Sequence, residues 1–430
     1  MINIHNIYIW LFIFLLAVLP ISTRNYIGYI DEVMCGLFFA VTIADCIINN
    51  AWRRYRLLWI IMGIIGGYLI YSFTYCRFNV TKSILMDAFI EIKPFAAFAI
   101  ILGSNLRLES MPHKAIKILA TIIATFMSFV IVSGYRFQNL ISGHPSSAGM
   151  TIFLATMIYL AVSIDTTGKW SRLNLILATI WLCCGLACGR SKYYAEFILA
   201  IFFIFFYRPM MLKSVKTSHV IIVSIFVICF IAATWHKIQY YFITGASDTF
   251  DPNVMASFAR PALYATGLLI LIDYFPFGCG LASFATYPSS APYSSLYYEY
   301  NLDKIWGLSP SYPNFICDAY YPSLAQFGIV GVILFVWFWR YAYRFLLRFL
   351  HTDATKYRNY FVIGTLIICF VLIECTSHTG FSTARGFMAM IILGLVARKS
   401  LDIKDISISS DDNINRSTQI ENKQIKRITI

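Results

Sequence analysis

Two arginines are the residues of this chain best suited to bind an anion. Arg190 stands in the segment CGRSKYY directly after an apolar run, with Lys192 two residues further on. Arg260 precedes Pro261 at the start of another apolar segment. A helix N-terminus binds anions through free N–H groups, and arginine adds a planar fork of donors for phosphate oxygens. The alternative in both places is an interfacial arginine whose stem lies along apolar surface.

A turn rich in glycine and proline follows Arg260. The turn, DYFPFGCGLASF, contains Gly278 and Gly280, and glycine permits backbone conformations closed to other residues and lets a ligand approach closely. The segment CDAYYPSLAQFGIVG then places Asp318, Tyr320 and Tyr321 before a further apolar run. Aromatic rings stack on sugar C–H groups, and a carboxylate accepts hydrogen bonds from hydroxyls. An ordinary belt of interfacial aromatic residues is the alternative.

Other ionisable residues stand in or beside apolar runs, where each is energetically expensive. Arg136 and His144 occur in YRFQNLISGHPSSAG, and Arg385 occurs in HTGFSTARGF. The remaining members are Asp31, Glu32, Asp87, Glu91 and Lys93. For each of these residues, a purely structural ion pair is the alternative to a functional role. His144 would titrate near neutral pH if unperturbed, although a histidine beside a Pro-Ser-Ser turn also fits an ordinary loop residue.

The cysteines and short motifs point away from metal chemistry. The 11 cysteines include no CxxC pair and no cluster with histidine at metal-ligand spacing. A P-loop, HExxH and GxGxxG are also missing. Cys279 and Cys317 fall in one long loop and would pair in an oxidising compartment, with two free thiols as the alternative. We therefore expect no metal site.

The composition is that of a multi-span membrane protein. Hydrophobic residues make up 59% of the chain and charged residues only 13%, whereas about 25% is usual for a soluble domain. The formal net charge of +13 does not indicate nucleic-acid binding, because the basic residues fall between apolar runs and form no single patch.

Hydropathy predicts an all-α fold with about twelve transmembrane helices and one long extracytoplasmic loop. The spans are expected near 5–22, 27–48, 57–76, 84–103, 117–135, 148–164, 173–189, 193–207, 219–235, 322–339, 360–376 and 381–397. Residues 1–235 thus hold spans one to nine, 236–321 the loop, 322–398 the last three spans and 399–430 a flexible polar tail. The Lys/Arg bias of the short loops puts both termini in the cytoplasm.

The segment 255–275 decides the topology of everything that follows it. Counting it as a span would place the basic residues of 340–358 outside the cell. It contains Arg260 and Pro261, and its uninterrupted apolar part is too short to cross a bilayer. We interpret it as an amphipathic helix at the outer leaflet, within the long loop.

The order of these motifs resembles the bacterial O-antigen polymerases (Wzy type) and the related O-antigen ligases. The shared features are YIDE in the second span, an EIKP segment, HPSSAG before the sixth span and GRS after the seventh. The loop adds R-P-ALY, DYFPFGCGLASF and DAYYPSLAQFGIVG. The resemblance covers most of the chain in architecture. In sequence it consists of short, degenerate motifs.

The resemblance implies a GT-C-like glycosyltransferase of the bacterial inner membrane with its active site on the periplasmic side. Such an enzyme transfers a growing glycan from undecaprenyl pyrophosphate to the non-reducing sugar of a lipid-linked repeat unit, without a cofactor. A chain-length regulator is an implied partner.

Within this scheme each candidate residue has an expected role. Arg190 and Arg260 would clamp the leaving pyrophosphate in place of a metal, with Lys192 or Arg136 as further cations. Asp318 would orient the acceptor or act as general base. Substrate binding would involve His144, Gly278, Gly280, Tyr320, Tyr321 and Arg385.

Three other functions remain as alternatives. Ligases of the family carry a His-Asn pair late in the loop, but this chain has no histidine between His236 and His351, which favours a polymerase. A flippase or other transporter would fit the number of spans, but we find no repeat between halves and the long loop on one side is unusual. A scaffold without chemistry would leave the outer arginines unexplained.

Overall fold

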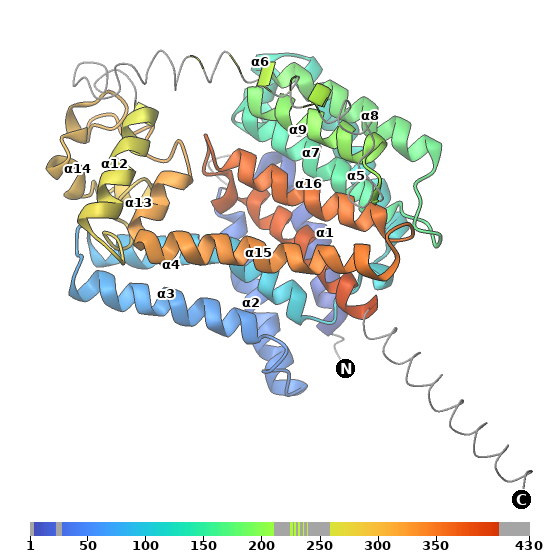
Figure 1. Cartoon of the computed structure of the whole chain (residues 1–430), viewed down its shortest axis with the longest axis horizontal. Helices are drawn as coiled ribbons and strands as arrows, with labels where there is room; N and C mark the ends of the chain where they lie inside the picture. The colour runs from blue at the N-terminus through green and yellow to red at the C-terminus, as the bar shows by residue number, and fades with distance from the viewer. Residues whose placement is uncertain are drawn as a thin grey trace, which may run out of the picture.

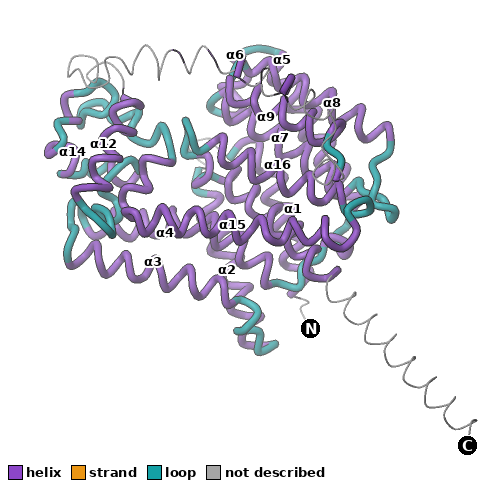
Figure 2. The backbone as a smooth tube through the Cα atoms, in the orientation of Figure 1, coloured by secondary structure: helices purple, strands orange, loops and turns teal. Residues whose placement is uncertain are grey.

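The described part of the chain consists of helices joined by turns (Figure 1, Figure 2). This computed structural model describes residues 4–22, 28–209 and 259–403, with a few isolated residues between 224 and 239. These ranges contain no strand and two isolated bridges, Ser290 with Tyr293 and Ser309 with Tyr312. The expected all-α class is therefore confirmed. The predicted ninth span (219–235), residues 236–258 of the loop and the tail from 404 lie outside these ranges.

The first group of helices brings most of the buried acidic residues into the fold. It comprises α1 (Ile4–Val18), the 3-10 turn η1 (Leu19–Ile21), α2 (Ile30–Ile48), α3 (Arg56–Thr74) and α4 (Thr81–Gly103). A short turn joins α3 and α4 into a hairpin, and α2 packs against both α1 and α4. The acidic residues of α2 and α4 are thereby placed side by side.

A second group surrounds α7, the most buried helix. Its members are η2 (Leu108–Ser110), α5 (His113–Val132), α6 (Tyr135–Ser142), α7 (Pro145–Val162), α8 (Arg172–Gly185), η3 (Leu186–Cys188), α9 (Ser191–Ile201) and the π-helical turn η4 (Phe202–Phe206). All of α7 is buried. Its first turns carry small residues, and the ring of Tyr193 from α9 packs against Gly149. Small side chains let helices approach closely, which explains the central position of α7.

The segment between residues 259 and 327 forms a lobe of short elements, which we call the outer lobe. It comprises α12 (Ala259–Asp273), α13 (Tyr287–Ser290), α14 (Leu296–Glu299), η7 (Leu302–Lys304) and η8 (Tyr321–Phe327). The lobe has an apolar cluster of its own, including Leu263, Phe284 and Tyr297. Figure 1 shows it at the left, where α3 ends and α4 and α15 begin. The 15 described residues of α12 extend about 22 Å, less than the roughly 30 Å needed to cross a bilayer core.

The last elements return from the outer lobe and end beside α7. They are α15 (Gly328–Asp353), α16 (Arg358–Glu374), the 3-10 turn η9 (Gly380–Ser382) and a helix over residues 384–403. The turn between α15 and α16 lies at the far end of the molecule from the outer lobe (Figure 1). The connection after α16, residues 375–383, comes back to the side of the outer lobe.

Five of the described helices are long and apolar enough to span a membrane. They are Ile4–Ile21, Arg56–Thr74, His113–Val132, Pro145–Val162 and Tyr321–Asp353. Several expose large apolar side chains, such as Ile70 at 67% and Ile333 at 61%, which is favourable in lipid and costly in water. The chain is therefore a helical membrane protein. The count of twelve spans, the GT-C-like architecture and the orientation stay predictions.

Gly278 locks the turn of the outer lobe onto η8. Its backbone has a φ of +81°, in the left-handed region, and its amide nitrogen donates to the carbonyl oxygen of Tyr274 at 2.8 Å. A Cβ at this position would overlap the carbonyl oxygen of Ala325 and the amide nitrogen of Gly328. Only glycine fits this conformation and this contact together.

Gly278→Ala should lower the midpoint of thermal unfolding of the purified protein in detergent by several degrees. Backbone strain of this kind costs about 1–3 kcal/mol, and the steric overlap adds to it. The matched control is Gly66→Ala on α3, where a Cβ would meet open space, and its midpoint should equal that of the wild type or exceed it. Equal midpoints for Gly278→Ala and wild type would contradict the assignment.

Candidate functional site

Arg190 and His144 face each other at the beginnings of two helices. Gly189 takes a φ of +67° and ends η3, so that the chain turns and Arg190 becomes the N-cap of α9. His144 is the N-cap of α7, with Pro145 at the first helical position, a placement that suits proline. The Nη2 of Arg190 lies 3.1 Å from the Nε2 of His144.

The hydrogen bonding of His144 turns this pair into two donors. Its Nδ1 accepts the backbone N–H of Ser146 at 3.1 Å, which caps α7. Burial, together with the charges of Arg190 and Lys192, lowers the pKa of His144 to about 4, so the ring is neutral at pH 7. A neutral imidazole has one acceptor nitrogen, and since Nδ1 serves in that role the proton lies on Nε2. Two N–H donors therefore point at the same small region.

Lys192 is bound to a carboxylate from the end of α16. Its Nζ donates to Oε2 of Glu374 at 2.6 Å, and both side chains are largely buried. Glu196 lies one turn further along α9 and is 1% exposed. Sequence reasoning missed both glutamates, because each stands alone within an apolar run. Lys192 therefore reaches the site as part of an ion pair.

Arg260 and Asp318 form an ion pair within the outer lobe. Arg260 is in the first turn of α12, and its Nη2 donates to Oδ2 of Asp318. One turn later the hydroxyl of Tyr264 donates to the carbonyl oxygen of Thr376 at 2.8 Å. This bond fastens α12 to the connection after α16. Two residues to which sequence analysis gave separate roles are thus one unit.

His378 stands in the connection after α16 and was not singled out from the sequence. Burial lowers its pKa to about 3, with smaller contributions from Lys192, His144, Arg385 and Arg260. Its ring lies near the start of α7, because a Cβ on Gly380 would meet both Met150 and the Nδ1 of His378. Its position in the same outer segment as Arg385 was the one signal available beforehand.

Arg385 holds the beginning of α7 in place. It is 1% exposed, and its Nε donates to the carbonyl oxygen of Ser147 at 2.9 Å and to Oγ1 of Thr151 at 2.8 Å. Its Nη2 lies 3.4 Å from the carbonyl oxygen of Leu19. These bonds hold the first turns of α7, and therefore His144, against the helix over 384–403. Arg385 is a positioning residue that also lines a neighbouring cavity.

Several predicted binding residues have other partners in the structure. The space beside Gly278 is filled by the backbone of η8, and a Cβ on Gly280 would lie 3.0 Å from the carbonyl oxygen of Cys76. These glycines therefore pack the chain against itself and make no room for a ligand. Arg136 is exposed on α6.

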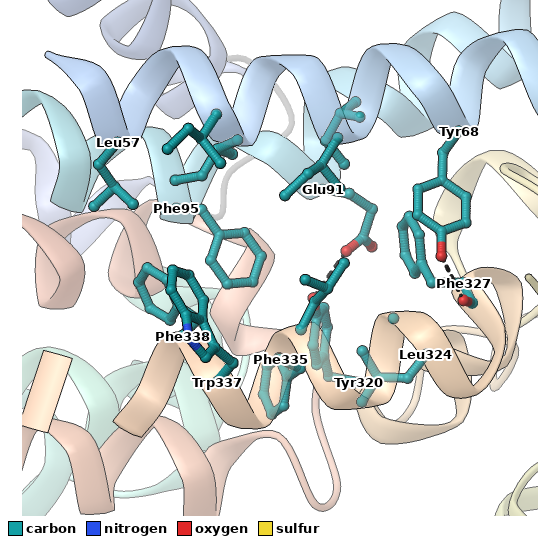
Figure 3. Close-up of a pocket in the computed structure, with 16 residues that line it drawn as sticks. Leu57, Tyr68, Glu91, Phe95, Tyr320, Leu324, Phe327, Phe335, Trp337 and Phe338 are labelled. Carbon is teal, nitrogen blue, oxygen red and sulfur yellow. Dashed lines mark hydrogen bonds between the residues drawn. The ribbon is translucent and has the colours of Figure 1, made fainter. Parts of the chain in front are cut away.

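The two tyrosines before α15 are not free to stack on a sugar. Tyr320 is 1% exposed, and its hydroxyl donates to Oε2 of Glu91 at 2.9 Å (Figure 3). Tyr321 is half-buried, and its hydroxyl donates to the carbonyl oxygen of Leu372 at 2.8 Å. Because η8 turns back into the helix bundle, both rings point inward. The ring of Tyr320 thus has no open face for a sugar in this structure, and its role in substrate binding stays a prediction.

The acidic residues of α2 and α4 lie close to a lysine and to backbone donors. Lys93 forms ion pairs with Asp31 and with Glu32, the latter at 2.6 Å. Asp87 accepts the backbone N–H of Ala282 at 2.6 Å. Asp31, Glu32 and Lys93 thus form the ion pairs that the structural alternative predicts.

Cys279 and Cys317 are free thiols in the structure. The Sγ of Cys279 lies 2.9 Å from the hydroxyl oxygen of Ser283. Within the described ranges, no group of three or more His, Cys, Asp or Glu side chains is placed to hold a metal ion.

His144→Gln should reduce the acid sensitivity of the protein. The pKa of His144 is about 4 in the fold and about 6.5 when unfolded, so neutral His144 favours the fold above pH 6.5. This contribution is lost as the pH falls from about 6.5 towards 4. The thermal midpoint in detergent should therefore fall less over this range in His144→Gln than in wild type. His351→Gln, exposed near the end of α15, is the control and should follow wild type; parallel curves for His144→Gln and wild type would oppose the assignment.

Comparison with known proteins finds no protein-family model and no curated protein that matches this chain.

Proposed function

We propose that this protein is an O-antigen polymerase, a membrane glycosyltransferase that uses undecaprenyl pyrophosphate-linked glycans as donors. The motif order described above supports this function. The residues of the fold support it through a site in which the cations Arg190, Lys192 and Arg260 are accompanied by the neutral rings of His144 and His378; we call it the cationic site. Such a site suits a pyrophosphate, the part of the substrate that all donors of this class share.

One observation carries the proposal, namely that the Nη2 of Arg190 lies 3.1 Å from the Nε2 of His144, to which the cap bond at Nδ1 assigns the ring proton. Two N–H groups this close repel each other unless an acceptor beside them accepts from both. A phosphate oxygen accepts from both, and charge-assisted bonds to guanidinium are among the strongest in proteins. Among the described residues, the side chain of Arg190 contacts this imidazole and forms no ion pair with a carboxylate. Its charge is therefore available to a ligand.

The proposed reaction needs negative charge to be stabilised on the leaving group. A hydroxyl oxygen of the acceptor forms a bond to the anomeric carbon of the donor glycan. The bond between that carbon and the phosphate oxygen breaks, and undecaprenyl pyrophosphate leaves with the electron pair. Arginines fixed in place before the reaction stabilise this charge, and one such donor is worth about 10²–10³ in rate. Arg190 and Arg260 would act in this way, with Lys192 behind them.

The hydroxyl proton of the acceptor must pass to a base. Asp318 accepts a hydrogen bond from Arg260, so its carboxylate is engaged in an ion pair. Burial, with smaller contributions from Lys192, His144, Arg385 and Arg260, lowers the pKa of His378 to about 3, so its ring is neutral and can accept a proton. A bound pyrophosphate would oppose the contribution of these positive charges and so raise the pKa of His378 in part. We therefore place His378 ahead of Asp318 as the base.

The clamp predicts that lysine cannot replace either arginine. In a strain lacking this gene, lipopolysaccharide should consist of core with a single repeat, and the wild-type gene should restore the ladder of long chains. Arg190→Lys and Arg260→Lys should each reduce polymer by about 100-fold or more, because a point charge lacks the planar fork. Arg77→Lys, exposed in the turn between α3 and α4, should restore the full ladder.

Other outcomes of the same gel would identify another function. A ladder restored by both lysine variants, at wild-type protein levels, would contradict the clamp. Bare core with accumulated lipid-linked polymer would identify a ligase. Bare core without lipid-linked polymer would identify an exporter.

His378→Gln and Asp318→Asn separate the two candidate bases. His378→Gln should reduce polymerisation in membrane vesicles strongly at every pH between 6 and 8. Asp318→Asn should reduce it moderately and leave the shape of the pH profile unchanged, because this carboxylate mainly orients Arg260. The opposite ranking would return the role of base to Asp318.

A further inference from the structure

A cavity of about 570 Å³, lined by apolar surface and by several polar side chains, lies beside the cationic site and is not part of it. This size is within the range of small-molecule sites, about 300–1,000 Å³. Carboxylates and hydroxyls dominate its polar lining, notably those of Asp31, Glu32, Glu91, Thr379, Ser382 and Thr383. Arg385 also lines it. We refer to it as the acidic cavity.

The acidic cavity touches the cationic site through two chain segments. Cys317 lines the cavity, whereas the next residue, Asp318, is paired with Arg260. Thr379 lines the cavity, and Thr376 of the same connection accepts from Tyr264, one turn after Arg260 on α12. Adjacent residues therefore face two compartments, and a ligand in the cavity would have one end within reach of the cationic site.

The charges of the cavity indicate which ligand it suits. Lys93 binds Asp31 and Glu32, and Arg385 bonds towards α7, so the cations of this region are already engaged. Oε2 of Glu32 is buried and accepts no hydrogen bond from any described residue. Among the described residues, the cavity therefore offers a pyrophosphate no cation that is not already engaged. A sugar would donate its hydroxyls to these carboxylates, and an amino sugar would suit them equally.

Glu91 connects the cavity with an apolar groove. Glu91 lines both, and Figure 3 shows it with Tyr320 in the groove formed by α3, α4, η8 and α15. The groove is lined by residues such as Ile61, Phe95 and Leu324. Because α3 and α15 expose apolar side chains on their outer surfaces, this groove adjoins lipid. A ligand tethered to a lipid chain would thus have an apolar route to the cavity.

We propose that the acidic cavity binds the sugar of a second, lipid-tethered substrate, the acceptor of the glycan. This proposal rests on the proposed function for the name "acceptor", but the sugar-binding property can be tested by itself. The acceptor hydroxyl would be presented at the border formed by Cys317 and Thr379. The donor pyrophosphate would occupy the cationic site on the other side of that border.

The test measures sugar binding to the full-length protein in lipid nanodiscs. The probe is the set of oligosaccharides released by partial acid hydrolysis of the host strain's own surface polysaccharide. Glu32→Gln removes one charge, and Ser382→Phe fills the cavity without removing any. Both should weaken binding about tenfold or more, since a hydrogen bond to a charged group is lost or blocked. Glu299→Gln, an exposed carboxylate on α14, is the matched control and should bind like wild type.

The affinity of the same variants for undecaprenyl pyrophosphate distinguishes the acidic cavity from the cationic site. The two cavity variants should keep wild-type affinity for this lipid. Arg190→Ala should lose affinity for the lipid and keep affinity for the oligosaccharides. A wild-type protein that does not bind the oligosaccharides, or cavity variants that bind them normally, would overturn the proposal.

Failure of the proposed function would look different. If the cavity variants lose sugar binding but a deletion strain keeps its long-chain ladder, the cavity is a sugar site of a protein that is not the polymerase. If the deletion removes the ladder but the cavity variants bind sugar normally, the polymerase assignment stands and the cavity proposal fails.

Discussion

The geometry of the cationic site depends on the acceptors that bind the buried guanidinium of Arg385. Arg385 is the largest fully buried side chain of the described structure, and a buried charge must be compensated by hydrogen bonds. Its guanidinium donates these hydrogen bonds to the carbonyl oxygen of Ser147 and the hydroxyl of Thr151, in the first turns of α7. The helix over 384–403 is thereby fixed to α7, and the N-cap of α7 is His144. Arg190, Lys192 and Glu374 then assemble around this position.

Charge pairing in the rest of the outer half produces two compartments of opposite character. On one side, Lys192 is paired with Glu374 and Arg260 with Asp318, while Arg190 faces an imidazole. On the other side, Lys93 is shared by two carboxylates. Ions this close attract strongly in a medium of low dielectric constant, which keeps each compartment well defined. A substrate with an anionic end and a neutral, hydroxyl-rich end would have to place them differently in the two compartments.

Sequence reasoning found the class of fold and the principal arginines, because both leave local signals. Apolar runs reveal membrane helices, and Arg190 and Arg260 stand out as charges at their ends. It did not find Glu374 or His378, whose partners come from other helices. Asp318 and Tyr320 were recognised, but their partners Arg260 and Glu91 are distant in sequence. Tyr320 points inward because η8 folds back on the bundle, a tertiary effect with no local pattern. Gly278 was noted as permissive, yet the backbone that occupies its space belongs to residues almost fifty positions away.

The pairing of Arg260 with Asp318 has a consequence for the proposed reaction. A pyrophosphate that enters the cationic site competes with Asp318 for the same guanidinium, and it presents more oxygens and more charge. Arg260 would therefore exchange one anionic partner for another, which costs less than desolvating a free arginine. Because Asp318 adjoins Cys317, which lines the acidic cavity, the ion pair joins the proposed donor site to the proposed acceptor site along the chain.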